Sequence, residues 1–152
     1  MGYTHLYAPD VERDYESHLL DETLRAALVR LNPSFPPDAI DGALSKLKNF
    51  ETGSPLRKNM VFMDYLQNGL TVKYADRGEE RSVLLRLLDY DRPDNNDFYV
   101  VNQFTFVERS NNRRPDIILF VNGLPLVLME LKSPAKDEVG AENAFRQIRN
   151  YM

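Results

Sequence analysis

The sequence predicts an α+β fold in which helices pack against a central β-sheet that is mixed or antiparallel. Apolar residues recur at helical spacing through the first 67 residues, and from about residue 70 they alternate with the period of a strand. Helical spacing returns near the end of the chain, from about residue 138. With 152 residues, of which 43% are hydrophobic and 28% charged, the chain is long enough for one domain with its own core.

Three helices are expected in the first half, over residues 11–31, 37–48 and 55–67. The first ends at Asn32-Pro33, because the residue before a proline avoids the helical conformation. The third begins with Ser54-Pro55, an N-cap followed by proline at the first helical position. The apolar stripe of the first helix is predicted to belong to the core, and consists of Leu20, Leu24, Ala27, Leu28 and Leu31.

The sheet is expected between residues 70 and 132, in the order of an antiparallel meander. β-Branched and aromatic residues predict one long strand over 98–108, and residues 110–113 are predicted to form a turn. Two apolar runs within 114–133 flank Asn122-Gly123 and predict a hairpin. Two further strands are expected at 70–75 and 81–90.

Composition excludes several classes of site. The chain has no cysteine, which rules out a disulfide scaffold and any thiolate-ligated metal. Its two histidines, His5 and His18, lie far along the chain from the hairpin, which argues against a zinc site or a histidine-activated nucleophile. The net charge of −4 argues against a broad basic surface for nucleic acid. No apolar run approaches the roughly 20 residues that span a bilayer, so no membrane partner is expected.

Three charged residues stand at the open end of the hairpin, with Asp116 on one strand and Glu130 and Lys132 on the other. Strand residues two apart share a face, so Glu130 and Lys132 point the same way. With a regular two-residue Asn122-Gly123 turn, Asp116 lies opposite Met129 and points to the other face. An odd-length turn, or a β-bulge, brings Asp116 onto the face of Glu130. A shared site therefore requires one of these two irregularities.

Charged residues at strand ends are most often solvated or joined in a surface ion pair. The spacing here, PD-x13-E-x-K across a hairpin, favours a metal site as the second interpretation. Mg²⁺ takes hard oxygen ligands, commonly one or two carboxylates together with waters and a substrate phosphate. A desolvated lysine beside such carboxylates can hold or deprotonate a water. The residues alone leave both interpretations open.

A helix expected over 138–151 carries a second polar signal. Ala144, Gln147, Ile148 and Tyr151 fall on one face at helical spacing, and Gln147 interrupts the otherwise apolar stripe. A buried glutamine needs hydrogen-bond partners. In the alternative interpretation, Gln147 lies at the margin of the stripe and Tyr151 belongs to the core.

Both motifs together resemble those of the PD-(D/E)XK nuclease superfamily. PD-x13-ELK ends at Lys132, and Q-x-x-x-Y, from Gln147 to Tyr151, is similar to the glutamine–tyrosine motif of one subgroup. More narrowly, residues 95–151 resemble the N-terminal nuclease region of the R (restriction and motor) subunit of Type I restriction-modification enzymes. This resemblance extends from about Tyr3 to the end, and implies a restriction-endonuclease-like core that hydrolyses phosphodiester bonds of double-stranded DNA.

The resemblance implies a role for each matching residue of the hairpin. Asp116 and Glu130 are expected to bind Mg²⁺, for which Mn²⁺ can substitute. The backbone carbonyl of Leu131 is expected to be a further ligand. Lys132 is expected to position or help deprotonate the attacking water and to steady the pentavalent phosphate.

Beyond the hairpin, the resemblance implies that Gln147 and Tyr151 order the site. It also implies partners, namely double-stranded DNA and the modification and specificity subunits of a cytoplasmic restriction complex. The specificity subunit would read the DNA sequence, and ATP would act only through a separate motor domain. Arginines near the two motifs are expected either to contact phosphates or to form a solvated rim: Arg109, Arg113, Arg114, Arg146 and Arg149.

The chain departs from the family pattern in two respects. Superfamily nucleases carry a glutamate on a helix before the sheet, and none of Glu12, Glu16 and Glu22, on the first predicted helix, is assigned that role. No P-loop sequence is present. Residues 1–152 are therefore expected to be a single nuclease domain of a longer protein, with an upstream glutamate helix, a further strand and a helicase motor. The alternatives are a catalytically silent module that docks on other subunits, and another nuclease of the same superfamily.

Overall fold

The computed structural model of the chain describes residues 2–49, 53–108, 111–131 and 141–149. A four-stranded mixed sheet forms the centre of the α+β fold, which confirms the predicted class. Its strands, in spatial order, are β1 (Thr4–Tyr7), β4 (Phe98–Asn102), β7 (Ile117–Val121) and β8 (Leu124–Met129). Strand β1 runs parallel to β4, and the other neighbours are antiparallel. The sequence did not predict β1, because its pairing with a strand more than ninety residues later leaves no local signal.

Two hairpins stand outside the central sheet, so the single sheet predicted over residues 70–132 is divided into three. One consists of β2 (Leu70–Asp76) and β3 (Glu79–Leu85), and the other of β5 (Phe106–Glu108) and β6 (Asn111–Arg113). The second hairpin corrects two predictions, because the expected strand over 98–108 is interrupted and the expected turn at 110–113 contributes a strand.

The interruption between β4 and β5 has a local cause at Gln103. This residue has a φ of 56°, in the left-handed region that few non-glycine residues adopt. Its backbone N–H still donates to the carbonyl oxygen of Asp116 at 3.2 Å, the next position in the register of β4 and β7, and the chain leaves the ladder after this residue. The next residues, Phe104 and Phe106, are buried on the face of the sheet that carries Ile118.

Four α-helices are described: α1 (Asp21–Leu31), α2 (Pro37–Lys48), α3 (Pro55–Asn68) and α4 (Ala141–Arg149). The predicted bounds of the second helix are confirmed, and those of the third agree to within one residue. Ser54 caps α3 as expected, since its hydroxyl accepts a hydrogen bond from the N–H of Arg57 at 3.3 Å. Helix α4 lies within the predicted range of 138–151, whose remaining positions fall outside the described residues.

The first helix begins ten residues later than predicted, because residues 11–20 form a loop. Short polar side chains bond the loop backbone and so compete with helix formation. The Asp14 carboxylate accepts the N–H of Glu16 at 2.9 Å, and the Ser17 hydroxyl accepts the N–H of Leu19 at 3.2 Å. The prediction that Glu12 and Glu16 lie on a helix is therefore wrong, whereas Glu22 is on α1.

The buried residues form two cores that meet at α1. One lies among α1, α2, α3 and the β2–β3 hairpin, and the other lies between the central sheet and the segment containing Phe104 and Phe106. Helix α1 serves both, since Leu24 and Leu28 belong to the first core and Leu20, just before the helix, to the second. This confirms the predicted core stripe, except that Leu31 is only half-buried.

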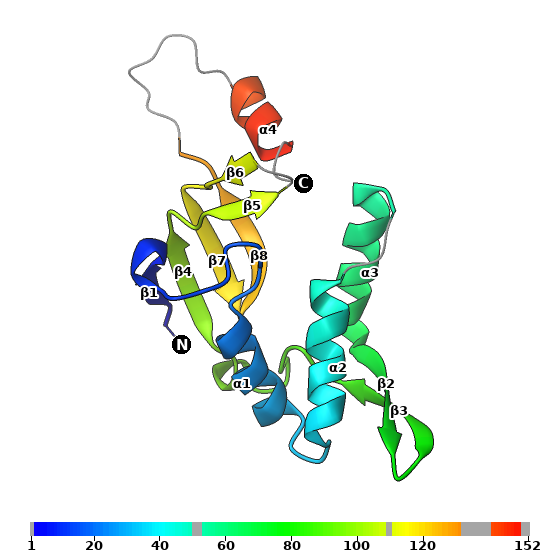
Figure 1. The fold of residues 1–152 in the computed structure, drawn as a ribbon. Coiled ribbons are helices and arrows are strands. Elements are labelled where there is room, and N and C mark those ends of the chain that lie inside the picture. Colours follow the sequence, from blue (N-terminus) through cyan, green and yellow to red (C-terminus); the bar gives the residue numbers. More distant parts are fainter. Residues whose placement is uncertain (1, 50–52, 109–110, 132–140, 150–152) are drawn as a thin grey trace.

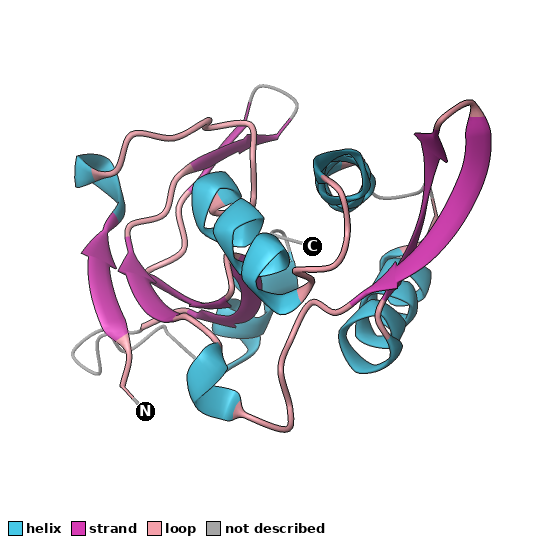
Figure 2. Cartoon of the chain, turned by 90° about the horizontal axis from the view of Figure 1, so that it is seen from below, coloured by secondary structure: helices cyan, strands magenta, loops and turns pink. Residues whose placement is uncertain are grey.

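Figure 1 shows this division, with the central sheet on one side, α2, α3 and the β2–β3 hairpin on the other, and α1 between them. The view from below in Figure 2 shows the same arrangement. Among the described residues, no helix combines the length and the apolar character needed to cross a membrane.

Candidate metal and catalytic site

The β7–β8 hairpin turns through only two residues, Asn122 and Gly123. Both have left-handed backbone conformations, with φ of 52° and 81°, as the tight hairpin turn that matches strand twist requires. Val121 is therefore paired with Leu124. With this turn alone, the carboxylate of Asp116 would point away from that of Glu130.

A β-bulge in β8 reverses this outcome. Phe120 pairs with Pro125, but the next residue along β7, Leu119, pairs with Val127, so Leu126 is the extra residue. Proline has no N–H to give to a ladder, and within sheets it occurs at edges and bulges. Pro125, inside an apolar run, was thus the signal in the sequence that could have located the bulge.

The bulge places the two carboxylate residues directly across from each other. Ile117 pairs with Met129, so the same register continued by one position sets Asp116 opposite Glu130. Residues that face each other across an antiparallel pair lie on the same side of the sheet. A shared site required either an odd-length turn or a β-bulge. The structure has the bulge, and the turn has an even length of two residues.

One contact ties the two strand ends together at this position. The backbone N–H of Leu131 donates to Oδ2 of Asp116 at 2.7 Å. Asp116 and Glu130 are both half-buried, and Oε1 of Glu130 is shielded from solvent. Hence the carboxylate of Asp116 is oriented by the strand that carries Glu130.

Three of the predicted site residues cannot be placed with the carboxylates. Lys132 and Tyr151 lie outside the described residues. Gln147 lies on α4, as predicted, but its side chain is outside the described part of the structure. Their roles therefore stay predictions.

The donor set at the hairpin end suits a small hard cation. Asp116 and Glu130 contribute carboxylate oxygens from the ends of adjacent strands. Leu131, the last residue of the described segment, offers a backbone carbonyl directly after Glu130. Within residues 2–49, 53–108, 111–131 and 141–149, no cluster of three or more acidic or histidine side chains forms a metal site. Two carboxylates are sufficient for Mg²⁺, which commonly keeps several waters and takes substrate phosphate as ligand.

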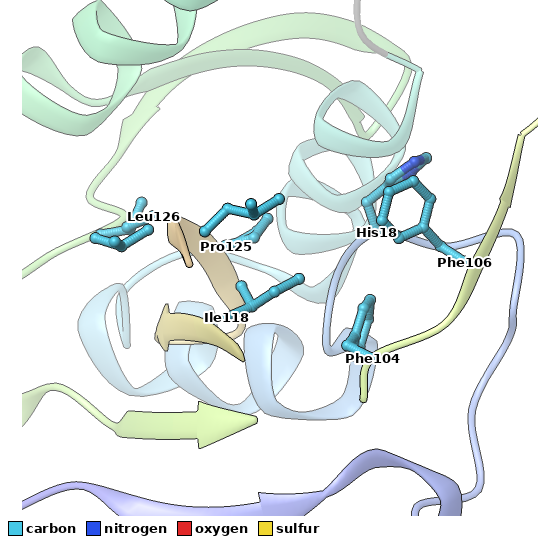
Figure 3. A pocket seen from close by; sticks show the side chains of 8 residues that line it. His18, Phe104, Phe106, Ile118, Pro125 and Leu126 are labelled. Atoms are coloured by element: carbon cyan, nitrogen blue, oxygen red, sulfur yellow. The ribbon is translucent and has the colours of Figure 1, made fainter. Parts of the chain in front are cut away.

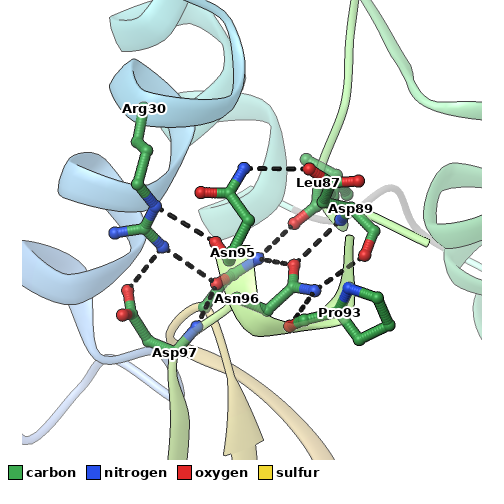
Figure 4. A network of polar contacts seen from close by, with 8 residues as sticks. Arg30, Leu87, Asp89, Pro93, Asn95, Asn96 and Asp97 are labelled. Carbon is green, nitrogen blue, oxygen red and sulfur yellow. Dashed lines mark hydrogen bonds and ion pairs between the residues drawn. The ribbon is translucent and has the colours of Figure 1, made fainter. Parts of the chain in front are cut away.

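The other end of the hairpin is anchored by a polar network around Asn122, which is fully buried. Its amide nitrogen donates to the carbonyl oxygen of Leu87 at 2.9 Å and to Oδ1 of Asn96 at 2.8 Å. Its amide oxygen accepts the N–H of Asp97 at 2.8 Å and a longer bond from Arg30 on α1. Figure 4 shows how this network joins α1 to the loop before β4.

The turn is also joined to the start of α1. The backbone N–H of Leu20 donates to the carbonyl oxygen of Gly123 at 3.0 Å. Because of these anchors, the turn is fixed to both cores, and the presence of one bulge between the turn and the strand ends decides that Asp116 and Glu130 share a face.

Comparison with known families shows which family the chain belongs to. All of the chain, residues 1–152, matches the family model described as the Type I restriction enzyme R protein N terminus (HSDR_N). The chain belongs to this family. The hairpin that sets Asp116 opposite Glu130 is therefore part of an R protein N-terminal region, the family that the sequence motifs indicated.

Individual relatives agree with the family. The Type I restriction enzyme HindI endonuclease subunit of Haemophilus influenzae is 34% identical over 160 residues, covering 99% of this chain and 15% of that relative. A relative from Methanocaldococcus jannaschii, named for the MjaIXP endonuclease subunit of a type I restriction enzyme, is 26% identical over 161 residues. This match covers 100% of this chain and 15% of the relative's length. The chain thus spans about 15% of these relatives.

The arginines predicted to meet DNA in this R protein region have different surroundings. Arg113 is half-buried at the end of β6, where it pairs with Phe106, and Arg114 is exposed. On α4, Arg146 forms an exposed ion pair with Glu142 at 3.1 Å, and Arg149 is exposed. Arg109 is outside the described residues. Of the four described members of this set, Arg113 alone is half-buried.

The structure brings one further residue, His18, to the hairpin. The sequence predicted that both histidines lie far from the hairpin. His18 is distant along the chain but lies beside the hairpin in space. His18 stands in the loop 11–20 and packs against Phe106, with ring centroids 4.5 Å apart and ring planes tilted by 53°. It lines a hollow together with residues of β7 and β8 (Figure 3). No local pattern could have indicated this, because the loop reaches the sheet through tertiary contacts.

Proposed function

We propose that this chain is the endonuclease domain of a Type I restriction enzyme R protein and hydrolyses phosphodiester bonds of double-stranded DNA with the help of Mg²⁺. One observation supports this above all others: the bulge in β8 sets Asp116 opposite Glu130 at the open end of the hairpin. Surface charges with no common function would not need this register. Membership of the R protein N-terminal family supports the same function.

Asp116, Glu130 and the Leu131 carbonyl would hold Mg²⁺, or Mn²⁺ in its place. The bound ion supplies two effects, a lower pKa of a bound water and neutralisation of charge at the phosphorus. The protein fixes the direction of its ligands beforehand, since the N–H of Leu131 already holds Oδ2 of Asp116 at 2.7 Å. Oδ1 of Asp116 is the oxygen left to face the cation.

Lys132 follows Glu130 by two residues, so a continued strand would bring its amino group to the same face. There the neutral amine would orient the attacking water and take up its proton, and the ammonium group so formed would balance charge on the phosphate. Gln147 and Tyr151 of the last helix would order this arrangement. Arg113, half-buried beside the carboxylate strand, would bind a phosphate next to the scissile bond.

Sequence recognition and movement along DNA would belong to other parts of the assembly. The modification and specificity subunits are the proposed protein partners, and ATP would be used by the remainder of the R protein. A restriction complex of this kind would work in the cytoplasm on double-stranded DNA. Residues 1–152 would form one nuclease domain within it.

The proposal is tested by metal binding and cleavage with the same set of variants. Calorimetry with Mn²⁺ should show one binding process that Asp116→Asn and Glu130→Gln remove, because each replaces a charged ligand oxygen by a neutral amide. Asp10→Asn, which changes an exposed aspartate outside the hairpin, is the matched control and should bind as the wild type does. Circular dichroism of each variant shows that the fold is kept.

Cleavage of plasmid DNA by the R protein with its partner subunits should be lost in Asp116→Asn and Lys132→Ala. Retained cleavage in Lys132→Ala would contradict the role of that lysine alone. Unchanged Mn²⁺ binding in both carboxylate variants would contradict the metal site itself.

A further inference from the structure

A hollow of about 190 Å³ lies beside the candidate metal site. It is open between the loop 11–20 and the edge of β8, and its lining is almost entirely apolar. Figure 3 shows His18 and Phe106 on one side of it, with Ile118, Pro125 and Leu126 across from them. Nothing in the proposed roles of the carboxylates uses this space.

The floor of the hollow is the next step of the same ladder. Ile118 and Leu128 are paired across β7 and β8, and both line the hollow. Ile118 follows Asp116 by two residues and Leu128 precedes Glu130 by two residues, so both pairs lie on the same face of the sheet. Two residues of a strand advance by about 7 Å. A phosphate bound at the carboxylates would thus hold its attached nucleoside within reach of the hollow.

The wall of the hollow has the chemistry that a nucleobase prefers. His18 is exposed and its imidazole packs at a tilt against the ring of Phe106, a residue that is only 4% exposed. Flat aromatic side chains bind unpaired bases by stacking, with little dependence on base identity. An imidazole also carries polar ring atoms that can meet a base edge.

This wall is held in place before any ligand arrives. The N–H of Val107 donates to the carbonyl oxygen of Tyr15 at 2.9 Å, which fastens the loop 11–20 to β5. The guanidinium group of Arg13 donates to the carbonyl oxygen of Thr105 and lies 3.9 Å from the ring centroid of Phe104. Burial lowers the pKa of Arg13 from its ordinary value, yet the guanidinium group remains a cation packed between rings.

A cation stands next to the same wall. Arg113 pairs with Phe106 across β5 and β6, so their side chains leave the small hairpin on one face. Its Nε is buried and has no hydrogen-bond partner among the described residues. Two residues that line the hollow thus adjoin phosphate-binding candidates: Ile118 lies two residues from Asp116, and Phe106 is paired with Arg113.

We propose that the hollow between His18 and the Ile118–Leu128 pair receives one unstacked nucleobase of the DNA strand whose phosphate lies at Asp116 and Glu130. The proposal rests on the nuclease function proposed above. A base reaches such a site only after it leaves the duplex stack, as in other enzymes that take a base out of the helix. The strand would be held through a base on one side of the scissile bond, without reading the sequence.

Binding of two short single-stranded probes tests this subsite without the free energy of unpairing. One probe is an eight-residue oligothymidylate, and the other has the same length and charge but lacks the four central bases. Fluorescence anisotropy in EDTA at fixed salt excludes cleavage. The wild type should bind the complete probe about tenfold more tightly, as expected for a base–aromatic contact.

Variants of His18 test whether this residue provides the surface on which the base stacks. His18→Ala should reduce the preference for the complete probe to less than about twofold, and His18→Phe should restore it because the stacking face is kept. His5→Ala is the matched control: His5 is the other histidine, is exposed on β1 and bonds Asn102 at 2.6 Å, so the preference should be unchanged. If His18→Ala fails to fold, Leu128→Trp, which fills the hollow from its floor, should abolish the preference in its place.

The results distinguish a failure of the proposed base subsite from a failure of the proposed nuclease function. Equal binding of both probes by the wild type, or a preference that survives His18→Ala or Leu128→Trp, overturns the subsite even if cleavage depends on Asp116. A preference that needs His18 in a protein with no metal-dependent cleavage upholds base binding and overturns the proposed nuclease function.

Discussion

Two hairpins of this molecule share one kind of turn but differ along their strands. The β2–β3 hairpin turns at Arg77 and Gly78, with φ of 52° and 86°, and the β7–β8 hairpin at Asn122 and Gly123, with φ of 52° and 81°. In β2–β3 the register is unbroken from the tip to the base, whereas in β7–β8 it shifts at a bulge. Hairpins with the same kind of turn therefore differ in which residues of the two strands lie opposite each other and share a face.

The surroundings of the two turns differ as strongly. A Cβ atom added to Gly78 would meet nothing within 4 Å, because that turn projects into solvent. A Cβ added to Gly123 would lie 2.6 Å from the carbonyl oxygen of Leu20 and 2.7 Å from the N–H nitrogen of Leu24. A turn sequence determines how strands begin to pair, but packing decides whether the tip is a solvent loop or an anchor. In this protein the anchored hairpin carries the candidate site.

Insertion of one glycine directly after Leu126 should have the largest effect, because β8 then holds one residue more than the bulge accommodates. Glu130 would move to the face opposite Asp116, since a slip of one residue reverses every side chain. Calorimetry should show at least a tenfold loss of Mn²⁺ affinity, or about 1.4 kcal/mol. Deletion of Leu126 is the control, because it removes the bulge but keeps Asp116 opposite Glu130, and it should bind Mn²⁺ normally. Equal binding by the insertion variant and the wild type would contradict the role of the register.

Gly123→Ala should be the most destabilising single substitution in the comparison. It adds a Cβ at a positive φ and against backbone atoms of the α1 start, for an expected loss of about 3–5 kcal/mol in the free energy of unfolding. The matched change Gly78→Ala meets only the positive φ, and should lose about 1–2 kcal/mol. Urea unfolding measures both. Equal losses would mean that the close approach of α1 contributes nothing.

Asn122→Ala should have the next largest effect on stability. It leaves the N–H of Asp97 and the carbonyl oxygen of Leu87 without the side chain that bonds them. Loss of buried hydrogen bonds at a left-handed residue should lower the free energy of unfolding by about 2–4 kcal/mol. Arg77→Ala, at the equivalent position of the exposed turn, should change it by less than about 0.5 kcal/mol. A small effect in both would show that the network does not anchor the hairpin.

The smallest effect concerns Asp89, which belongs to the loop beside the Asn122 network. Hydrogen bonds from the Asn95 side chain at 2.8 Å and the Arg92 N–H at 3.0 Å hold the pKa of its carboxyl below the ordinary value. A depressed pKa stabilises the fold above the unfolded-state pKa near 4, and this stability is lost as pH falls through the folded-state pKa.

Asp89→Asn should therefore lower the melting temperature at pH 7, with a difference that shrinks as the pH falls below about 4. Asp10→Asn, outside this network, controls for the loss of one charge. A difference from the wild type that stays constant between pH 7 and pH 3 would contradict the assigned cause.

Local signals in the sequence predicted much of the fold. The caps and stops of α2 and α3 are formed by residues next to each other in the chain, such as Ser54 and Pro55, so their bounds were predicted closely. The predicted helix over residues 11–20 was wrong because Asp14 and Ser17 bond the backbone locally. The separation of β2–β3 from the central sheet was missed because it depends on which core buries Leu70 and Leu85.

The candidate site was predictable only in part. Strand periodicity required an odd-length turn or a bulge to join Asp116 with Glu130, and the bulge at Leu126 provides it. Pro125 could have indicated its place. The approach of His18 could not have been predicted, because the contact joins a loop to a hairpin about a hundred residues later.

The sequence by itself determined the α+β class, the second and third helices, the turn at Asn122-Gly123 and the charged pattern at the hairpin end. These follow from short-range periodicity, capping and backbone preferences, which act between residues a few positions apart. The tertiary structure alone decided which strands share a sheet, that the turn is an anchor against α1, and that His18 stands beside the carboxylate face. Such features depend on burial and hydrogen bonding between distant segments, and their free energies exist only once both segments have been brought together.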